Sequence, residues 1–164
     1  MSKKITDLKV IKAFSFLSIP LILWFSKGEL LPSISDYAYT NPLLLGVLLT
    51  MAGMVFFDDG YIDRDRYYNM IIGGSLIVVA LTPYKEYPVI HFLFAGIFFL
   101  GSSFVMITYS SVKQRLVKII IGLFLLIGLL GHFVFNLYSL FFAEWIAMIP
   151  ISVHYAGESI GKFD

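Results

Sequence analysis

The segment Val89–Tyr109, VIHFLFAGIFFLGSSFVMITY, contains no Asp, Glu, Lys or Arg. An α-helix rises about 1.5 Å per residue, so roughly 20 apolar residues are needed to cross the hydrocarbon core of a bilayer, which is about 30 Å thick. The length and composition of this segment therefore predict a helix that spans a membrane.

Similar apolar segments recur along the whole chain. The six predicted spans cover about residues 10–26, 42–57, 67–83, 88–109, 115–133 and 138–157. Hydrophobic residues make up 59% of the 164 residues and charged residues only 14%, which leaves no room for a soluble domain. The sequence therefore predicts an all-α integral membrane protein, with one polytopic transmembrane domain over residues 1–164 and six helices in one bundle.

The basic residues are distributed unevenly about these six spans. Of the 12 Lys and Arg residues, only Lys27 and Lys85 fall on one side of the predicted topology. In multi-pass membrane proteins the excess of Lys and Arg lies on the cytoplasmic side. Both termini are therefore predicted to be cytoplasmic, and a bacterial inner membrane is the expected location.

Composition also excludes several classes of function. A net charge of +1 gives no indication of a nucleic-acid partner. The absence of cysteine excludes disulfides, thiolate metal sites and lipidated cysteines. The sequence contains no glycine-rich phosphate loop.

Polar residues within or beside the spans are the candidates for function, because ionisable groups are costly in lipid. Glu144 lies about six residues into the last span, roughly 9 Å from its outer end. His91 lies near the outer start of the fourth span and His132 near the outer end of the fifth, so all three share one leaflet. The loop before the second span adds polar residues at the same level: Ser33, Ser35, Asp36, Tyr37 and Tyr39.

Glu144, His91 and Asp36 are the predicted catalytic candidates, because carboxylates and imidazoles transfer protons in enzymes. The predicted ligand-binding candidates are Ser35, Tyr39, Ser102 and His132. A divalent metal such as zinc is compatible with these residue types but is not favoured, because no two histidines have the i, i+4 spacing of an H-E-x-x-H motif.

Each candidate also has a structural interpretation. Glu144 could be a hydrogen-bonded packing contact, and His91 and His132 could present polar tips to the headgroup region. Ser102 could form hydrogen bonds between helices, which is its favoured role. His91, Ala95, Phe98 and Ser102 lie on one helical stripe, which is expected to face the bundle interior.

The predicted cytoplasmic side carries a second polar group. Asp58, Asp59 and Gly60 are expected to end the second span and to begin a solvated loop that runs to Arg66. The spacing of the acidic residues in this segment does not match a calcium-binding loop. His154 and Glu158 lie near the inner end of the last span, too far along the helix to join the outer polar residues.

Three short motifs resemble those of a known group of proteins. They are the run Ser33–Tyr39 (SISDYAY) before the second span, Ala80–Pro83 (ALTP) at the end of the third, and His91 at the start of the fourth. Together they resemble small six-span bacterial membrane proteins of unknown function that are distantly similar to the FRAG, DRAM and Sfk proteins. Glu144, followed by Trp145, fits the same pattern.

This resemblance implies a polar pocket at the outer leaflet that involves Ser35, Asp36, His91 and Glu144. Members of the wider group are linked with lipid handling, and similar Ser, Asp and His patterns occur in seven-span intramembrane hydrolases of the ceramidase and progestin-receptor type. This chain departs from the hydrolase pattern, because it has six predicted spans and no paired histidines in its last helix.

The leading hypothesis is a membrane protein whose outer-leaflet pocket binds a lipid-like molecule, with or without modifying it. One alternative is a non-catalytic scaffold or accessory subunit. Another is a small proton-coupled transporter that uses Glu144, although the two halves of the chain show no inverted repeat of the kind common in transporters. The expected partners are membrane lipids, together with a second copy of the chain or a larger membrane complex.

Overall fold

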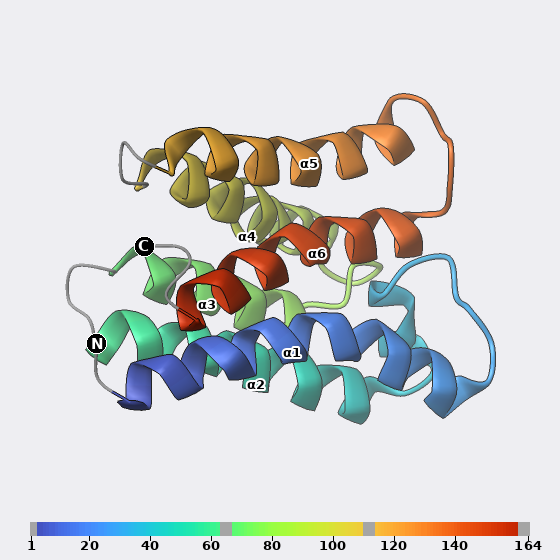
Figure 1. The fold of residues 1–164 in the computed structure, drawn as a ribbon. Helices are drawn as coiled ribbons and strands as arrows, with labels where there is room; N and C mark the ends of the chain where they lie inside the picture. Colours follow the sequence, from blue (N-terminus) through green and yellow to red (C-terminus); the bar gives the residue numbers. More distant parts are fainter. Residues whose placement is uncertain (1–2, 63–66, 110–113, 161–164) are drawn as a thin grey trace.

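The computed structural model describes residues 3–62, 67–109 and 114–160. Over these residues all the regular secondary structure is helical, as predicted. It consists of six α-helices and one short 3-10 helix (Figure 1). In chain order the elements are α1 (Lys3–Lys27), η1 (Ser35–Tyr39), α2 (Pro42–Ile62), α3 (Tyr68–Leu81), α4 (Pro88–Thr108), α5 (Arg115–Phe133) and α6 (Leu140–Ser159).

Five of the helices are long and apolar enough to cross a membrane, which suggests a multi-pass membrane protein. The exception is α3, whose 14 residues cover about 21 Å. It is shorter than the predicted span 67–83, because Pro83 disfavours helical geometry at the preceding residue, Thr82. Thr82 accordingly leaves the helix, with φ −122° and ψ 80°.

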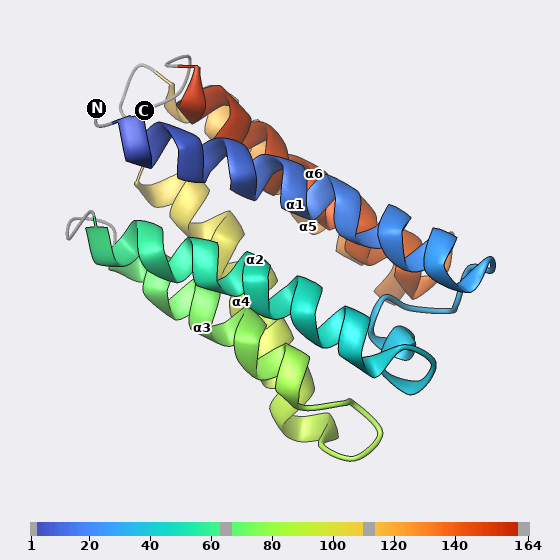
Figure 2. The ribbon, with the colours of Figure 1, turned by 90° about the horizontal axis from the view of Figure 1, so that it is seen from below.

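Glycine sets the closest approach between α2 and α3. A Cβ atom on Gly53 of α2 would lie 2.7 Å from the carbonyl oxygen of Gly73 in α3, and one on Gly73 would lie even closer to the carbonyl of Gly53. The two backbones are therefore in direct contact, and α2 and α3 run side by side (Figure 2). Small residues permit this kind of close packing between membrane helices.

An aromatic cluster fills the centre of the bundle. Phe16 of α1, Phe56 of α2 and Phe98 of α4 are each at most 1% exposed. The ring of Phe16 lies 5.4 Å from that of Phe56 and 5.6 Å from that of Phe98, and Tyr155 of α6 packs edge-on against Phe56. These contacts join α1, α2, α4 and α6 in one core.

Asp59 corrects the sequence prediction for the end of the second span. Helix α2 continues to Ile62, and Asp59 is buried rather than solvated. Its carboxylate accepts a 2.7 Å hydrogen bond from Asn69 of α3, and Asn69 in turn accepts one from Tyr155. A buried carboxylate requires such partners, and composition alone does not reveal them. Residues 63–66 of the expected loop lie outside the described residues.

A buried ion pair lies at the same end of the bundle. Lys9 Nζ lies 2.9 Å from Glu158 Oε2, and both side chains are 2% exposed. His154, one turn earlier on α6, is 3.5 Å from the other oxygen of Glu158. These residues join α1 to α6 and lie far from Glu144, as predicted.

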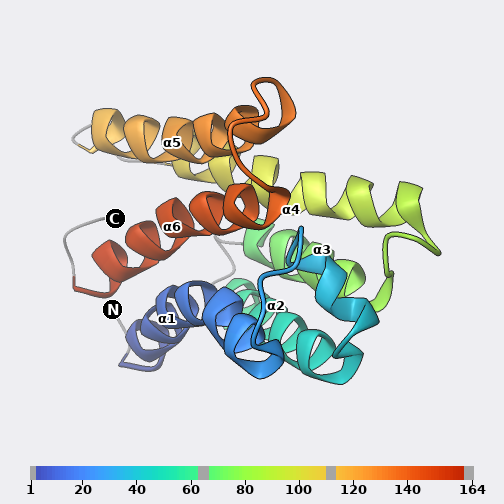
Figure 3. The same cartoon turned by 90° about the vertical axis from the view of Figure 1, so that its right-hand side faces the viewer.

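The segment 28–41, which includes η1, covers the opposite end of the bundle. We call this the η1 end; Figure 3 shows it facing the viewer. The amide of Phe141 donates to the carbonyl of Pro32 at 2.8 Å, which fastens the segment to the start of α6. The 82–87 and 134–139 connections lie at the same end, because consecutive helices run antiparallel.

Candidate functional site

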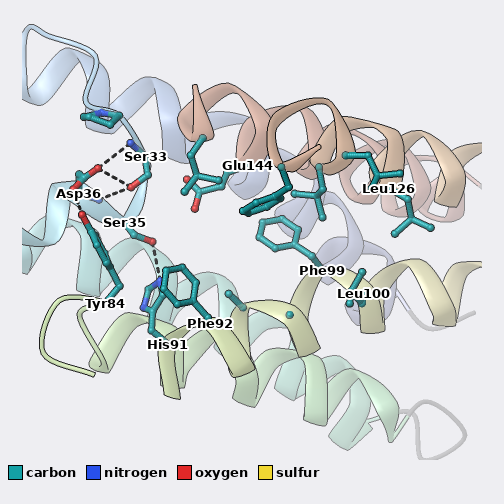
Figure 4. A pocket seen from close by; sticks show the side chains of 17 residues that line it. Ser33, Ser35, Asp36, Tyr84, His91, Phe92, Phe99, Leu100, Leu126 and Glu144 are labelled. Atoms are coloured by element: carbon teal, nitrogen blue, oxygen red, sulfur yellow. Dashed lines mark hydrogen bonds between the residues drawn. The ribbon is translucent and has the colours of Figure 1, made fainter. Parts of the chain in front are cut away.

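A cavity of about 1000 Å³ lies at the η1 end, between the 32–36 segment and helices α4, α5 and α6 (Figure 4). Its polar lining consists of Ser33, Ser35, Asp36, Tyr84, His91 and Glu144. Its apolar lining consists of Pro32, Phe92, Ala95, Gly96, Phe99, Leu100, Leu126, Leu129, Leu130, Phe133 and Leu140. Figure 4 shows most of the labelled polar groups at one end of the cavity and Phe99, Leu100 and Leu126 at the other.

Asp36 organises the polar end. Its carboxylate accepts hydrogen bonds from the backbone amide of Ser33 at 3.1 Å and from the Ser33 hydroxyl at 2.9 Å. It also accepts one from the Tyr84 hydroxyl at 2.7 Å, which links the 33–36 turn to the 82–87 connection. The hydrogen bond to Asp36 stabilises the neutral phenol and, together with desolvation, raises the pKa of Tyr84 to about 12.

Ser35 and His91 form a second polar contact. Ser35 Oγ lies 3.1 Å from His91 Nε2, and His91 Nδ1 lies 2.7 Å from the carbonyl oxygen of Thr82. A carbonyl can only accept a hydrogen bond, so the neutral imidazole carries its proton on Nδ1. His91 Nε2 is then the acceptor for the Ser35 hydroxyl.

Glu144 fixes the position of the residue before Ser35. Its Oε2 accepts a 2.7 Å hydrogen bond from the backbone amide of Ile34. The carboxylate reaches the segment because Glu144 lies in the first turns of α6, about one turn after Phe141, which bonds to Pro32. Glu144 thus lines the cavity and holds the loop that forms its polar end.

The apolar part of the cavity separates α4 from α5. On one side of it the two helices are in contact, because Ser103 donates a 3.0 Å hydrogen bond to the carbonyl of Gly122. A Cβ atom on Gly122 would lie 2.9 Å from the side chain of Ile107. Towards the η1 end the cavity lies between the two helices, and Phe92 and Phe133 at its edge are 54% and 65% exposed. The cavity therefore has an apolar rim between α4 and α5.

The structure brings four of the predicted site residues to one cavity: Ser35, Asp36, His91 and Glu144. They come from the η1 segment, α4 and α6, which only the tertiary structure brings together. The predicted stripe on α4 also faces inward, since His91, Phe98 and Ser102 are all buried.

Three other candidates do not line this cavity. The hydroxyl of Tyr39 donates to Glu86 at 2.9 Å and accepts from the backbone amide of Lys85 at 2.7 Å. Ser102 donates to the carbonyl of Phe98 within its own helix. The sequence predicts a hydrogen bond between helices instead. His132 Nδ1 contacts the carbonyl of Tyr138 at 2.7 Å. The contacts of Tyr39 and His132 hold the connections at the η1 end in place.

Sequence reasoning did not select Tyr84 or the carbonyl of Thr82, and it named Ser33 only as one polar residue of the loop before the second span. Tyr84 lies in the turn between Pro83 and Pro88, and nothing in its local sequence distinguishes it from other interfacial tyrosines. A backbone carbonyl leaves no signal in a sequence. Within the described ranges, no group of three or more His, Asp or Glu residues is arranged to hold a metal ion.

Comparisons with known proteins place the chain in a family. Neither the curated proteins nor the solved structures contain a match. The model of a family of unknown function, DUF7103, matches residues 18–159, which include the η1 segment and every helix that lines the cavity. This agrees with the resemblance to proteins of unknown function, but nothing links the chain to the FRAG, DRAM and Sfk group. The chain belongs to DUF7103, a family of unknown function.

Proposed function

We propose that this protein is a multi-pass protein of a bacterial inner membrane that binds a lipid-like molecule in the cavity at the η1 end. The observation that carries the proposal is the division of the cavity into a polar end and an apolar section. Ligand sites are usually apolar cavities with a few converging polar groups, and this division matches a molecule with a headgroup and a hydrocarbon chain.

The apolar section suits a hydrocarbon chain. Phe99 and Leu100 of α4 and Leu126 of α5 continue the cavity away from the polar end (Figure 4), and Leu130 of α5 also lines it. The exposed rim between α4 and α5 would face lipid if the helices span a bilayer. A lipid could then enter sideways from the membrane without exposing its chain to water.

The lining favours an uncharged headgroup. It contains the acidic side chains of Asp36 and Glu144 but no Lys or Arg. A phosphate would meet the Asp36 carboxylate here without a cationic partner. Hydroxyl or amide groups could instead donate to Glu144, whose Oε1 makes no hydrogen bond with any described residue.

The distribution of charge supports an outer-leaflet position for this cavity. Lys27 and Lys85 lie at the η1 end, whereas Lys9, Arg115 and Lys118 lie at the opposite end. If the more basic end is cytoplasmic, the cavity opens near the outer leaflet.

Native mass spectrometry of the protein released from lipid nanodiscs tests the proposal. The wild-type protein is expected to retain one lipid of uncharged headgroup. Gly96→Phe is expected to lower the retained fraction at least tenfold, because Gly96 lines the cavity and a Cβ there meets nothing within 4 Å. Gly46→Phe is the matched control, since Gly46 of α2 has equally open space but does not line the cavity.

A wild-type protein without retained lipid would contradict the proposal and favour a scaffold or accessory subunit. Equal retention by Gly96→Phe and the wild type would show that any bound lipid lies elsewhere. A preference for anionic phospholipids would contradict the assignment of the headgroup.

A further inference from the structure

The contact between Ser35 and His91 has the geometry of an activated nucleophile. A serine hydroxyl is a weak nucleophile until a general base accepts its proton, and such pairs are separated by about 2.6–3.2 Å. Ser35 Oγ and His91 Nε2 are 3.1 Å apart. In known pairs a third group orients the base, and here the carbonyl of Thr82, 2.7 Å from Nδ1, occupies that position.

The Thr82 carbonyl is available because of where α3 ends. The last carbonyls of a helix have no amide partner within the helix. Thr82 is the residue that follows α3, and the next turn is closed by amides that donate to Pro83, not to Thr82. His91 Nδ1 therefore meets a free acceptor, which keeps the proton away from Nε2.

Among the described residues, no carboxylate competes for the hydrogen bond between Ser35 and His91, and both residues can be reached from the cavity. Asp36 is a positioning residue, because its carboxylate accepts from Ser33 and Tyr84 whereas the imidazole of His91 contacts Ser35 and Thr82. Ser35 and His91 are 9% and 4% exposed, yet both line the cavity. A reacting group must therefore reach them through the cavity.

We propose that Ser35 is the nucleophile and His91 the general base of a lipid hydrolase that cleaves an acyl ester of uncharged headgroup. This inference rests on the proposed lipid-binding function and adds a reaction to it. The acyl chain would occupy the space between α4 and α5, which places the ester near the boundary between the apolar lining and Ser35.

The reaction proceeds in two balanced steps. Ser35 Oγ forms a bond to the ester carbonyl carbon while its proton moves to His91 Nε2. The bond from the carbonyl carbon to the alkoxy oxygen then breaks, and that oxygen takes the proton from His91 and leaves as an alcohol. In the second step His91 removes a proton from water, which attacks the acyl-serine, and a fatty acid is released as Ser35 regains its proton.

A long-chain alkyl fluorophosphonate tests this inference directly. Ser35 Oγ would bond to phosphorus while fluoride leaves, and the adduct is measured by intact-protein and peptide mass spectrometry in nanodiscs. We expect one adduct on the wild-type protein, at Ser35, and none on Ser35→Ala. His91→Gln is expected to react at least 100-fold more slowly, as is typical when a general base is removed.

Ser75→Ala is the matched control, because Ser75 of α3 is also buried but donates to the carbonyl of Ile71 in its own helix and does not line the cavity. It is expected to be labelled at close to the wild-type rate. The wild type should also release fatty acid from 4-nitrophenyl palmitate, whereas Ser35→Ala should not.

Three results would overturn the inference: no adduct on the wild-type protein, an adduct that persists in Ser35→Ala, or wild-type labelling of His91→Gln. Native mass spectrometry separates this failure from failure of the proposed function. Wild-type protein that is not labelled but retains lipid would contradict the hydrolase inference and leave the lipid-binding proposal standing. Wild-type protein that retains no lipid would contradict the proposed function itself.

Discussion

Glu144 of α6 accepts a 2.7 Å hydrogen bond from the backbone amide of Ile34, although the two residues are 110 positions apart in the chain. This bond joins the last helix to the segment that carries Ser35. The same helix holds that segment a second time, through the amide of Phe141 and the carbonyl of Pro32. The polar end of the cavity therefore depends on how α6 docks against the η1 segment.

Two replacements of Glu144 should isolate its role as a hydrogen-bond acceptor. Glu144→Gln retains an oxygen that can accept from the amide of Ile34, whereas Glu144→Ala leaves that amide without its partner. We expect Glu144→Ala to lower the free energy of unfolding by about 1–3 kcal/mol and Glu144→Gln to lower it by clearly less. Denaturant titration in detergent micelles measures both. Equal losses in the two variants would show that the hydrogen bond is unimportant.

Alkaline titration should reveal the bond between Tyr84 and Asp36. The pKa of Tyr84 is raised from 10.0 to about 12. Because the folded-state pKa is the higher one, the stabilising effect is complete below pH 10 and is lost as the pH rises through about 12. The tyrosinate absorbance of the wild type minus that of Tyr84→Phe isolates this group. A difference curve with its midpoint near 10.0 would contradict the bond.

Alanine at two adjacent glycines of α3 should affect stability differently. A Cβ atom on Gly73 would lie 2.8 Å from the backbone nitrogen of Phe57, so Gly73→Ala must push α3 away from α2. We expect it to destabilise the protein by about 1–3 kcal/mol. Nothing lies within 4 Å of a Cβ on Gly74, so Gly74→Ala should be neutral or stabilise by up to about 1 kcal/mol. Thermal unfolding compares them, and similar melting temperatures would argue against direct contact of the two backbones.

The buried ion pair at the opposite end should matter far more than an exposed one. Lys9 and Glu158 are 2% exposed, so Glu158→Gln breaks a buried ion pair. The expected loss is about 3–5 kcal/mol. Lys27 and Glu29 are 3.7 Å apart with side chains 40% and 62% exposed, and Glu29→Gln should cost less than about 1 kcal/mol. The free energies of unfolding of the two variants, measured under the same conditions, check this contrast. A small loss for Glu158→Gln would contradict the burial of the pair.

Much of the helical architecture follows from the sequence. In lipid every backbone polar group must be satisfied within the segment, so long apolar runs must be helices. The helices α4 and α5 accordingly begin and end within one or two residues of the predicted spans. The shortening of α3 is also local in origin, because it follows from Pro83. The continuation of α2 past Asp59 was mispredicted, because its carboxylate is satisfied by Asn69, a partner on the next helix.

The sequence by itself determined which residue types are available to a site at the η1 end: Ser35, Asp36, His91 and Glu144 all follow from the cost of placing polar groups beside lipid. Only the tertiary structure decided which of them meet. The docking of α6 brings Glu144 to Ile34, and the end of α3 exposes the carbonyl that orients His91 towards Ser35. The physical reason is that hydrophobicity acts on whole segments without direction, whereas hydrogen bonds require particular atoms to lie within about 3 Å of one another.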